Sequence, residues 1–542
     1  MRNDRDSHQR PGGREGQTHK DYEYSPVSAS VSQTANDSDT LQETQFFTVA
    51  TGIDQHNHRY HYQDSEMEEK GSRLLQYLSS GAGNICAVAA AVAMGWSSPM
   101  LPMLKQDPIT DDNPIGRPIT EEEGSWIGSL IAMGGAIGGC AAGFLAEKFG
   151  RKNALLLSTI PALIGWILIA TANNLPQIYI ARILFGISTG IPYTVLPMYI
   201  GEVAETSIRG ALGSLMQVFI TLGLLYSYII GPYVTYTVLW IASICVPIVF
   251  FVSFVTMPES PYYFLSKGRK EDAIKSVSRL RGKSAASVQK EVDEMQVAVE
   301  EAYRNQGSFL SLFTVKSNLK ALSLTSALVA FQQFAGINVV LFYSGDIFNS
   351  TGSGFSSGIS TIIVGLVMLV SSSITPLVVD KLGRKILLMG SAVGMTITLA
   401  ALGLYFFLKN VVEQDVSSLS WLPVVSLVVY IAAFSLGWGP LPWAVMGELF
   451  ASDVKSKASS LTVVICWILA FCITKFFTNV EKALGTHTAF WIFGVCCILS
   501  GFFVFFLLPE TKGKSLQQIQ DELNGIKSDH LNLHAVPGSV KH

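Results

Sequence analysis

The stretch Phe331-Gln332-Gln333-Phe334-Ala335-Gly336-Ile337-Asn338 lies inside an apolar run of about residues 319–348. This run is long enough to cross a bilayer, because a helix rises ~1.5 Å per residue and ~20 residues span the hydrocarbon core. An unpaired amide in hydrocarbon costs several kcal/mol, so the carboxamides must face other helices or a wet cavity. At ~100° per residue Gln332, Gln333 and Asn338 can share one broad helix face. Neutral amides both donate and accept hydrogen bonds, so they predict a hydroxyl-rich ligand such as a sugar, with hydrogen bonding between helices as the alternative.

Apolar runs of similar length recur along the whole chain. Of its 542 residues, 49% are hydrophobic and only 15% are charged. A large soluble core would give shorter apolar runs. We therefore predict an all-α membrane protein with twelve transmembrane helices, at about residues 80–104, 124–146, 154–172, 176–200, 211–231, 236–257, 319–348, 356–379, 386–408, 420–446, 459–480 and 487–508.

Several other classes of protein find no support in the composition. The net charge is −3 and no basic stripe occurs, so nucleic acid is not an expected partner. The sequence has no phosphate-binding loop, no metal-ligand cluster and no nucleophile–base pair, so we expect no enzyme activity, no cofactor and no metal. All seven cysteines fall inside predicted spans, where buried packing is expected rather than a disulfide framework.

Two similar turns divide the chain into halves. Glu147-Lys148-Phe149-Gly150-Arg151-Lys152 follows the second span, and Asp380-Lys381-Leu382-Gly383-Arg384-Lys385 follows the eighth. Six spans return the chain to the same side of the membrane, so this is a parallel internal repeat. The predicted domains are a disordered tail at 1–74, a six-helix half at 75–257, a linker with amphipathic surface helices at 258–318, a second six-helix half at 319–510 and a tail at 511–542.

The basic residues predict how the chain is oriented in the membrane. They gather in the turns after spans 2, 4, 8 and 10, whereas the short loops on the opposite side hold few. The positive-inside rule therefore places these turns and both termini in the cytoplasm. The sequon Asn349-Ser350-Thr351 then lies outside, and we expect a glycoprotein modified at Asn349.

Acidic and basic side chains at the cytoplasmic ends of the spans predict a gate. Ion pairs formed across the two halves would close the inner mouth, and each would contribute only ~1 kcal/mol because it is partly wetted. The alternative is ordinary positive-inside charge. The candidate gate residues are Glu147, Arg151, Glu202, Arg209, Asp380, Arg384, Glu448 and Lys455.

The tenth span is predicted to be broken. Gly437-Trp438-Gly439-Pro440-Leu441-Pro442-Trp443 contains two prolines and two glycines, which cannot hold a regular helix. Broken segments are tolerated where they line a cavity or pack inside protein. Trp443 beside the break favours a hinge at a binding site, and a structural kink is the alternative.

These motifs together resemble the sugar porter family of the major facilitator superfamily. The resemblance covers about residues 75–525 and rests on the two repeated turns, Glu202…Arg209-Gly210, Pro258-Glu259-Ser260, Gln332-Gln333…Gly336-Ile337-Asn338, Gly439-Pro440-Leu441-Pro442-Trp443 and Pro509-Glu510-Thr511. Within that family, Phe434-Ser435-Leu436-Gly437 and residues 510–516 look most similar to insect facilitated trehalose transporters and their intracellular-type glucose transporter relatives.

The resemblance implies a central sugar site. By matched position, the implied substrate-binding residues are Gln217, Gln332, Gln333, Asn338, Trp443 and Trp467, and the implied outer gate is Phe342 and Tyr343. The chain departs from glucose transporters where these carry polar side chains. Met368 and Cys466 stand where they carry asparagines, and Ser435 stands where they carry a glutamate. Fewer groups to grip a hexose leave room for a larger or different sugar.

The pattern of acidic residues bears on energy coupling. Proton-coupled transport needs a titratable group in the membrane path, and the sugar–proton symporters of the family carry an aspartate in the first span. The first span here has none, and Asp346 is near the outer end of the seventh. The lack of such a group predicts downhill transport, and together with the resemblance it predicts a multi-pass plasma-membrane uniporter for trehalose or a related sugar. The alternatives are a hexose facilitator, a proton–sugar symporter and a non-transporting sugar sensor.

Overall fold

The structure of the protein is a computed structural model. The chain divides into two compact units, Met1–Glu66 and Met67–His542, and the first lies outside the described residues. The described residues are 71–304, 308–342, 357–450, 454–514 and 516–525.

Some predicted features fall outside that described part. They include the predicted gate residue Tyr343, the predicted glycosylation site Asn349 and nearly all of the tail at 1–74. Asp380 lies in a described helix, but its side chain is outside the described part.

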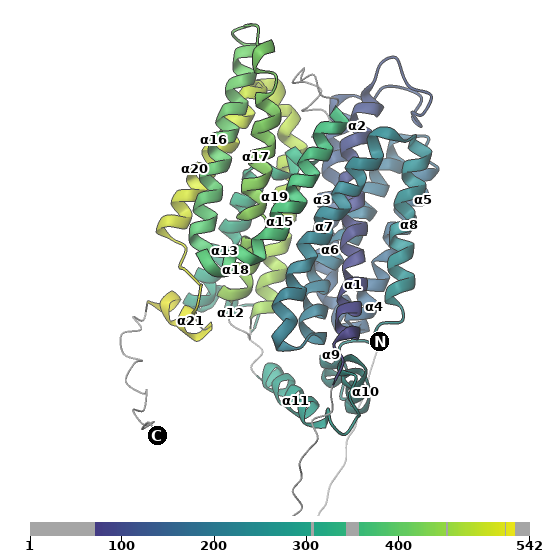
Figure 1. Cartoon of the computed structure of the whole chain (residues 1–542), viewed down its shortest axis with the longest axis vertical. Coiled ribbons are helices and arrows are strands. Elements are labelled where there is room, and N and C mark those ends of the chain that lie inside the picture. The colour runs from purple at the N-terminus through teal and green to yellow at the C-terminus, as the bar shows by residue number, and fades with distance from the viewer. Residues whose placement is uncertain (1–70, 305–307, 343–356, 451–453, 515, 526–542) are drawn as a thin grey trace, which may run out of the picture. The chain divides into compact units, whose positions relative to one another are not determined.

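The N-terminal half contains six membrane-crossing segments, drawn in purple to teal in Figure 1. Its helices are α1 (Leu74–Gly95), α2 (Ser97–Lys105), α3 (Glu121–Phe149), α4 (Arg151–Leu157), α5 (Thr159–Ala170), α6 (Leu175–Val203), α7 (Thr206–Ile230) and α8 (Tyr236–Phe254), with a 3-10 turn at Gly231–Tyr233.

The linker and the C-terminal half follow in the same way. The linker holds α9 (Pro261–Ser266), α10 (Lys270–Arg281), α11 (Gln289–Arg304) and α12 (Ser311–Thr314). The second half holds α13 (Lys316–Phe334), α15 (Ser357–Leu382), α16 (Arg384–Asn410), α17 (Leu422–Leu436), α18 (Leu441–Leu449), α19 (Lys455–Leu484), α20 (Thr486–Phe506) and α21 (Leu516–Asn524), with a 3-10 turn at Ser417–Leu419.

Every regular element in the described residues is a helix, and eleven helical segments there are long and apolar enough to cross a membrane. The remaining predicted span is the seventh, residues 319–348, which begins within α13; its predicted range extends beyond residue 342, where this described range ends. The prediction of an all-α membrane protein is confirmed.

Helix boundaries follow from local hydrogen-bonding groups. Thr120 and Glu123 form a capping box at the start of α3, each side chain accepting a hydrogen bond from the other residue's backbone N–H. Arg117 forms an ion pair with Glu123 at 2.5 Å. A polar cap of this kind satisfies the free N–H groups that begin a helix. It fixes the end of α3 that lies farthest from the linker, which we call the far end.

The repeated turns form the same structure twice at the opposite end, which we call the linker end. Gly150 has φ 95° and Gly383 has φ 90°, a region that favours glycine. The Glu259 carboxylate accepts a hydrogen bond from the backbone N–H of Lys152, and the Glu510 carboxylate accepts those of Arg384 and Lys385. Each carboxylate therefore neutralises the positive end of the helix that follows the turn.

The linker helices pack on the N-terminal half. Arg281 is buried, and it donates to the carbonyl of Val203 at 2.9 Å and forms an ion pair with Glu291 at 2.8 Å. The apolar faces of α10 and α11 bury a small cluster of their own, which includes Val277 and Val292. The linker is thus folded structure anchored to the end of α6.

Helices α3 and α6 approach each other closely enough for their backbones to touch. A Cβ atom added at Gly134 would lie 2.1 Å from the Ile183 carbonyl oxygen, and one at Gly186 would lie 2.1 Å from the Ile131 oxygen. Only glycine fits at such a contact, and small residues of this kind let helices associate tightly in membranes. This packing fixes α6 against α3.

Candidate functional site

All six predicted substrate-binding residues line one cavity between the halves. Its wall is formed by α1, α6 and α7 of the N-terminal half and by spans of the C-terminal half. The space between these side chains, including the part open to solvent, is about 640 Å³. The predicted residues on the wall are Gln217, Gln332, Gln333, Asn338, Trp443 and Trp467.

Gln332 is held by the backbone of the broken tenth span. Its Nε2 atom donates to the carbonyl of Trp438 at 2.7 Å and to that of Gly439 at 2.9 Å. Both of its amide hydrogens are therefore used within the protein, whereas its Oε1 atom accepts from Gln333 Nε2 at 3.3 Å. The Nε2 group of Gln332 therefore serves the alternative role, hydrogen bonding between helices, while the residue also lines the cavity.

Gln333 and Asn338 continue the chain of amides. Gln333 Nε2 also contacts Cys466 Sγ at 3.1 Å, and its Oε1 atom accepts from Asn338 Nδ2. Asn338 keeps its Oδ1 atom and its second N–H group without a partner among the described residues. These groups are thus available to a solute in the cavity.

Two further polar groups on the wall are available. Gln217 of α7 has no hydrogen-bond partner among the described residues. Trp467 Nε1 is buried and likewise has no partner in the described part of the chain. A buried donor without a partner costs about 1–3 kcal/mol, so a hydroxyl that accepts from it would be bound favourably.

The seventh span is interrupted at Gly336, a position at which the sequence analysis did not place a break. Helix α13 ends at Phe334, Gly336 has φ 85°, and the chain is helical again over residues 337–342. A Cβ atom at Gly336 would lie 2.6 Å from Phe493, so no larger residue fits there without movement. The carboxamides therefore do not share one face of a continuous helix. Asn338 reaches Gln333 across the break, and the predicted gate residue Phe342 is fully buried beyond it.

The tenth span is broken where the sequence predicts. Helix α17 ends at Leu436 and α18 begins at Leu441. The indole N–H of Trp438 donates to the Leu388 carbonyl at 3.0 Å, which holds the break against α16. Gly439 and Trp443 line the cavity, so this segment forms part of the wall.

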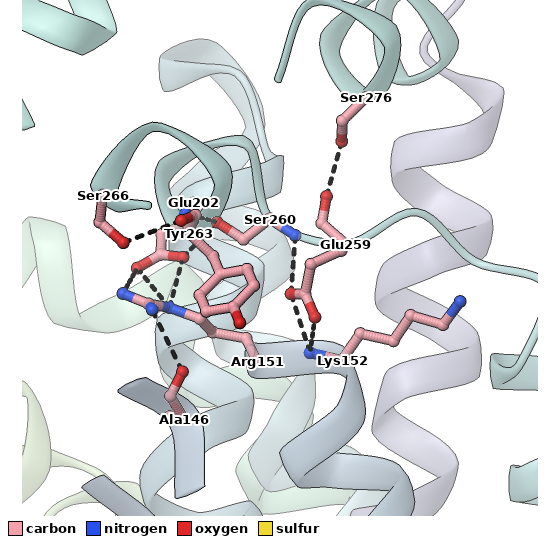
Figure 2. Close-up of polar contacts among 9 residues, drawn as sticks. All are labelled: Ala146, Arg151, Lys152, Glu202, Glu259, Ser260, Tyr263, Ser266 and Ser276. Atoms are coloured by element: carbon pink, nitrogen blue, oxygen red, sulfur yellow. Dashed lines mark hydrogen bonds and ion pairs between the residues drawn. The ribbon is translucent and has the colours of Figure 1, made fainter. Parts of the chain in front are cut away.

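The ion pairs at the linker end lie within each half. Arg151 forms an ion pair with Glu202 at 2.9 Å, and the Ser260 hydroxyl donates to the same carboxylate (Figure 2). In the C-terminal half, Arg384 pairs with Glu448 at 2.9 Å. We expected these side chains to pair across the two halves, but in this structure each pair forms within one half. The arginine and the glutamate of a pair lie at the ends of adjacent helices of the same half, which brings them within reach of each other.

Among the described side chains, the other predicted gate residues, Glu147, Arg209 and Lys455, form no ion pair. Glu147 and Arg209 are exposed, and the described residues give neither an ion-pair partner. Arg209 donates to the Ala204 carbonyl and Lys455 to the Gly447 carbonyl, each within its own half. These contacts hold helix ends rather than joining the two halves.

The halves meet at the far end through residues that the sequence analysis missed. Lys475 of α19 donates to the Ser125 hydroxyl of α3 at 2.7 Å, and its ammonium lies 4.3 Å from the Trp126 ring centroid. Trp126 also contacts Phe471 of α19, at 6.2 Å between centroids. The available signal was a lysine within the predicted span 459–480, where a charged side chain needs a partner.

Two membrane-embedded halves around a cavity lined with uncharged amides define a transporter of polar solutes. The family model described as "Sugar (and other) transporter" matches residues 49–523, and the chain belongs to this family. It is therefore a multi-pass membrane protein that transports sugar and is not an enzyme.

Known relatives agree along most of the chain. It is 38% identical over 452 residues to the facilitated trehalose transporter Tret1 of Polypedilum vanderplanki, covering 83% of this chain and 88% of the relative. It is 36% identical over 465 residues to Tret1 of Bombyx mori, covering 86% and 90%. The major facilitator proton:xylose symporter XylE, solved with 6-bromo-6-deoxy-D-glucose, is 25% identical with a TM-score of 0.65, covering 83% and 98%. The predicted twelve-helix major facilitator fold is confirmed.

Proposed function

We propose that this sugar transporter carries trehalose downhill across the plasma membrane, with its halves rocking around the central cavity. The proposal rests on the side chains that line the cavity. Among those described, none is a carboxylate, an imidazole or an amine, and the strongly polar ones are four amides, two indoles and a tyrosine hydroxyl, beside the weakly polar thiol of Cys466. Such groups bind hydroxyls and do not exchange protons near neutral pH.

The choice of trehalose has two supports. The relatives named above are facilitated trehalose transporters, at 36–38% identity. In addition, Met368 and Cys466 line the cavity where glucose transporters are expected to carry amides. A site with fewer polar groups grips one hexose ring less firmly, and it suits a solute that spreads its hydroxyls over two rings.

The orientation follows from the basic residues at the linker end, which we assign to the cytoplasm together with both termini. The far end is then extracellular, and there Lys475, Ser125 and Trp126 join the halves. Sugar would reach the cavity from the cytoplasmic side in this conformation. The opposite conformation would open the far end and close the linker end.

Uptake into proteoliposomes tests the proposal. Vesicles preloaded with unlabelled trehalose should take up labelled trehalose in a transient overshoot, with no proton gradient and no effect of an uncoupler. Labelled glucose in the same vesicles should enter more slowly. Faster glucose uptake would indicate a hexose facilitator, and accumulation that an uncoupler collapses would indicate a proton symporter. Binding without uptake of either sugar would indicate a sensor.

A further inference from the structure

Tyr193 is a cavity residue that none of the predicted motifs includes. It lies on α6 and lines the cavity together with the predicted sugar-binding residues. Met94, Ile220 and Leu224, which also line the wall from the N-terminal half, have no strong hydrogen-bonding side chain. Among the described residues, Gln217 and Tyr193 therefore supply the polar groups of that half.

The hydroxyl of Tyr193 is free to bind a ligand. Its described contact is Met94 Sδ at 4.0 Å, and a thioether is a weak acceptor at such a distance. A tyrosine hydroxyl within a protein usually finds a hydrogen-bond partner, and here the cavity lies beside it. A sugar hydroxyl would provide both a donor and an acceptor for it.

The ring of Tyr193 meets the opposite half. It lies edge-on to Trp467, at 5.6 Å between ring centroids and 70° between planes, a favourable arrangement for aromatic rings. Trp467 in turn lies against Gly135 of α3, where an added Cβ would be 2.7 Å from the indole. The indole is thus held between two helices of the N-terminal half, and its unpartnered N–H belongs to the same wall.

The position of Tyr193 is fixed from behind. At Gly190, three residues earlier on α6, an added Cβ would lie 2.2 Å from the Gly135 carbonyl oxygen of α3. This backbone contact leaves α6 little freedom to slide. A rigidly placed hydroxyl can discriminate between solutes, because a ligand that fails to reach it leaves a buried polar group unpaired.

We propose that Tyr193 is a specificity-determining residue that binds a glycosyl hydroxyl of the transported sugar from the N-terminal half. This inference rests on the proposed sugar transport. The ring closes the cavity against Trp467, and the hydroxyl completes the site opposite the amides of the C-terminal half. The residue thereby replaces polar contacts that Met368 and Cys466 do not make.

The test compares Tyr193→Phe with the unmodified protein in proteoliposomes. The variant keeps the ring and its contact with Trp467, and it removes only the hydroxyl. Its KM for trehalose should rise about five- to tenfold, with the maximal rate nearly unchanged. Tyr226→Phe on α7 is the control, because the Tyr226 hydroxyl binds the Ala242 carbonyl and the residue does not line the cavity.

Monodeoxy analogues of trehalose identify the contact itself. One analogue lacks the sugar hydroxyl that binds Tyr193. For this analogue the unmodified protein and Tyr193→Phe should show the same KM, because the hydrogen bond between the two hydroxyls is absent in both cases. The other analogues should keep the five- to tenfold difference. A merely structural role of Tyr193 would change KM for every analogue alike and would lower the melting temperature, which is measured in detergent.

The outcomes separate the two proposals. An unchanged KM for trehalose in Tyr193→Phe, or an equal change for all analogues, would overturn the role of Tyr193 alone. If the unmodified protein transports glucose and not trehalose, the proposed substrate is wrong, and deoxyglucoses replace the analogues in the same comparison. If Tyr193→Phe fails to assemble, Tyr193→Leu is used instead, and the trehalose concentration needed for half of the ligand-induced rise in melting temperature should be at least five- to tenfold higher than for the unmodified protein; an unchanged concentration would refute the inference.

Discussion

The ammonium group of Lys475 and the hydroxyl of Ser125 form a 2.7 Å hydrogen bond that joins the two halves of the molecule. The Lys475 side chain is only 8% exposed, and Glu122 lies 3.9 Å from its ammonium. A buried charge needs such partners, because an unpaired ammonium in a membrane protein is costly. The contact can exist only while the far end is closed.

Lys475→Met should therefore favour opening of the far end. A hydrogen bond to a charged group contributes about 1.5–3 kcal/mol, so the ratio of open to closed molecules should rise about tenfold or more. Spin labels at Asp112 and Ala483, in a variant without reactive cysteines, would report the distance between the halves. Lys482→Met, on the exposed surface of α19, is the control and should leave the distance distribution unchanged. An unchanged distribution in Lys475→Met would show that this bond does not hold the closed state.

Gly135→Ala should impair the conformation described here. The new methyl group would lie 2.7 Å from the Trp467 ring, and overpacking of this kind costs about 1–3 kcal/mol. We expect slower trehalose uptake, because the state closed at the far end becomes less populated. Gly143→Ala on the same helix is the matched control, since nothing lies within 4 Å of its added Cβ. Equal uptake rates for the two variants would contradict the packing argument.

Gln332 and Asn338 should differ in what their loss costs. Gln332→Ala removes two hydrogen bonds to the broken segment between α17 and α18, so its melting temperature should fall as well as its affinity for sugar. Asn338→Ala removes a single hydrogen bond, to Gln333, so its melting temperature should fall less, while its affinity should fall several-fold to thirtyfold, as expected for ~1–2 kcal/mol. Thermal unfolding and ligand binding on the same preparations distinguish them. Glu294→Ala, on the exposed surface of α11, should change neither quantity.

The repeated turns predict a difference between Ser260 and Thr511. The Ser260 hydroxyl donates to Glu202, whereas the corresponding Thr511 Oγ1 and Glu448 Oε2 atoms are both buried without a partner in the described residues. Ser260→Ala should therefore lower the free energy of unfolding by about 1–2 kcal/mol. Thr511→Val, which keeps the shape and removes an unpaired hydroxyl, should be neutral or stabilising. Denaturation in detergent measures both, and an equal loss in the two variants would refute the difference.

Glu510 should give the protein a specific sensitivity to acid. Burial alone would raise the pKa of this carboxyl, but backbone N–H groups of Lys512, Lys385, Arg384 and Thr511 outweigh burial and hold the pKa below its ordinary value of 4.5. A lowered folded-state pKa means that its stabilising effect is complete above about pH 4.5 and is lost as the pH falls through the folded-state pKa.

Glu510→Gln should consequently be less stable than the unmodified protein at pH 7 and show a smaller further loss on acidification. Melting temperatures between about pH 6 and about pH 3 would reveal this. Glu301→Gln, an exposed carboxyl of α11, should follow the unmodified curve. Parallel curves for Glu510→Gln and the unmodified protein would mean that Glu510 does not titrate as its contacts imply.

The lengths of the apolar runs predicted the spans, and the resemblance to the sugar porter family implied the six residues that the structure brings together in the cavity. The length of an apolar span is set by the thickness of the bilayer, and amides in apolar helices must face either other helices or a wet cavity. The break at Gly336 was less visible, because a single glycine is tolerated in many helices and its φ depends on Phe493. The partners of Arg151 and Arg384 depend on which helix ends are neighbours in this conformation, which sequence spacing does not contain. Tyr193 was missed because its role requires Trp467, far away in the chain.

The glycine contacts between α3 and α6 make these two helices move as one rigid unit. This unit contains both Gly135, which contacts the Trp467 indole, and Tyr193. Any motion of α3 and α6 that separates Gly135 from the Trp467 indole must therefore also move the Tyr193 hydroxyl away from the cavity. Substrate selectivity and transport rate are therefore coupled, and a substitution that adapts the site to another solute will also change how readily the far end opens.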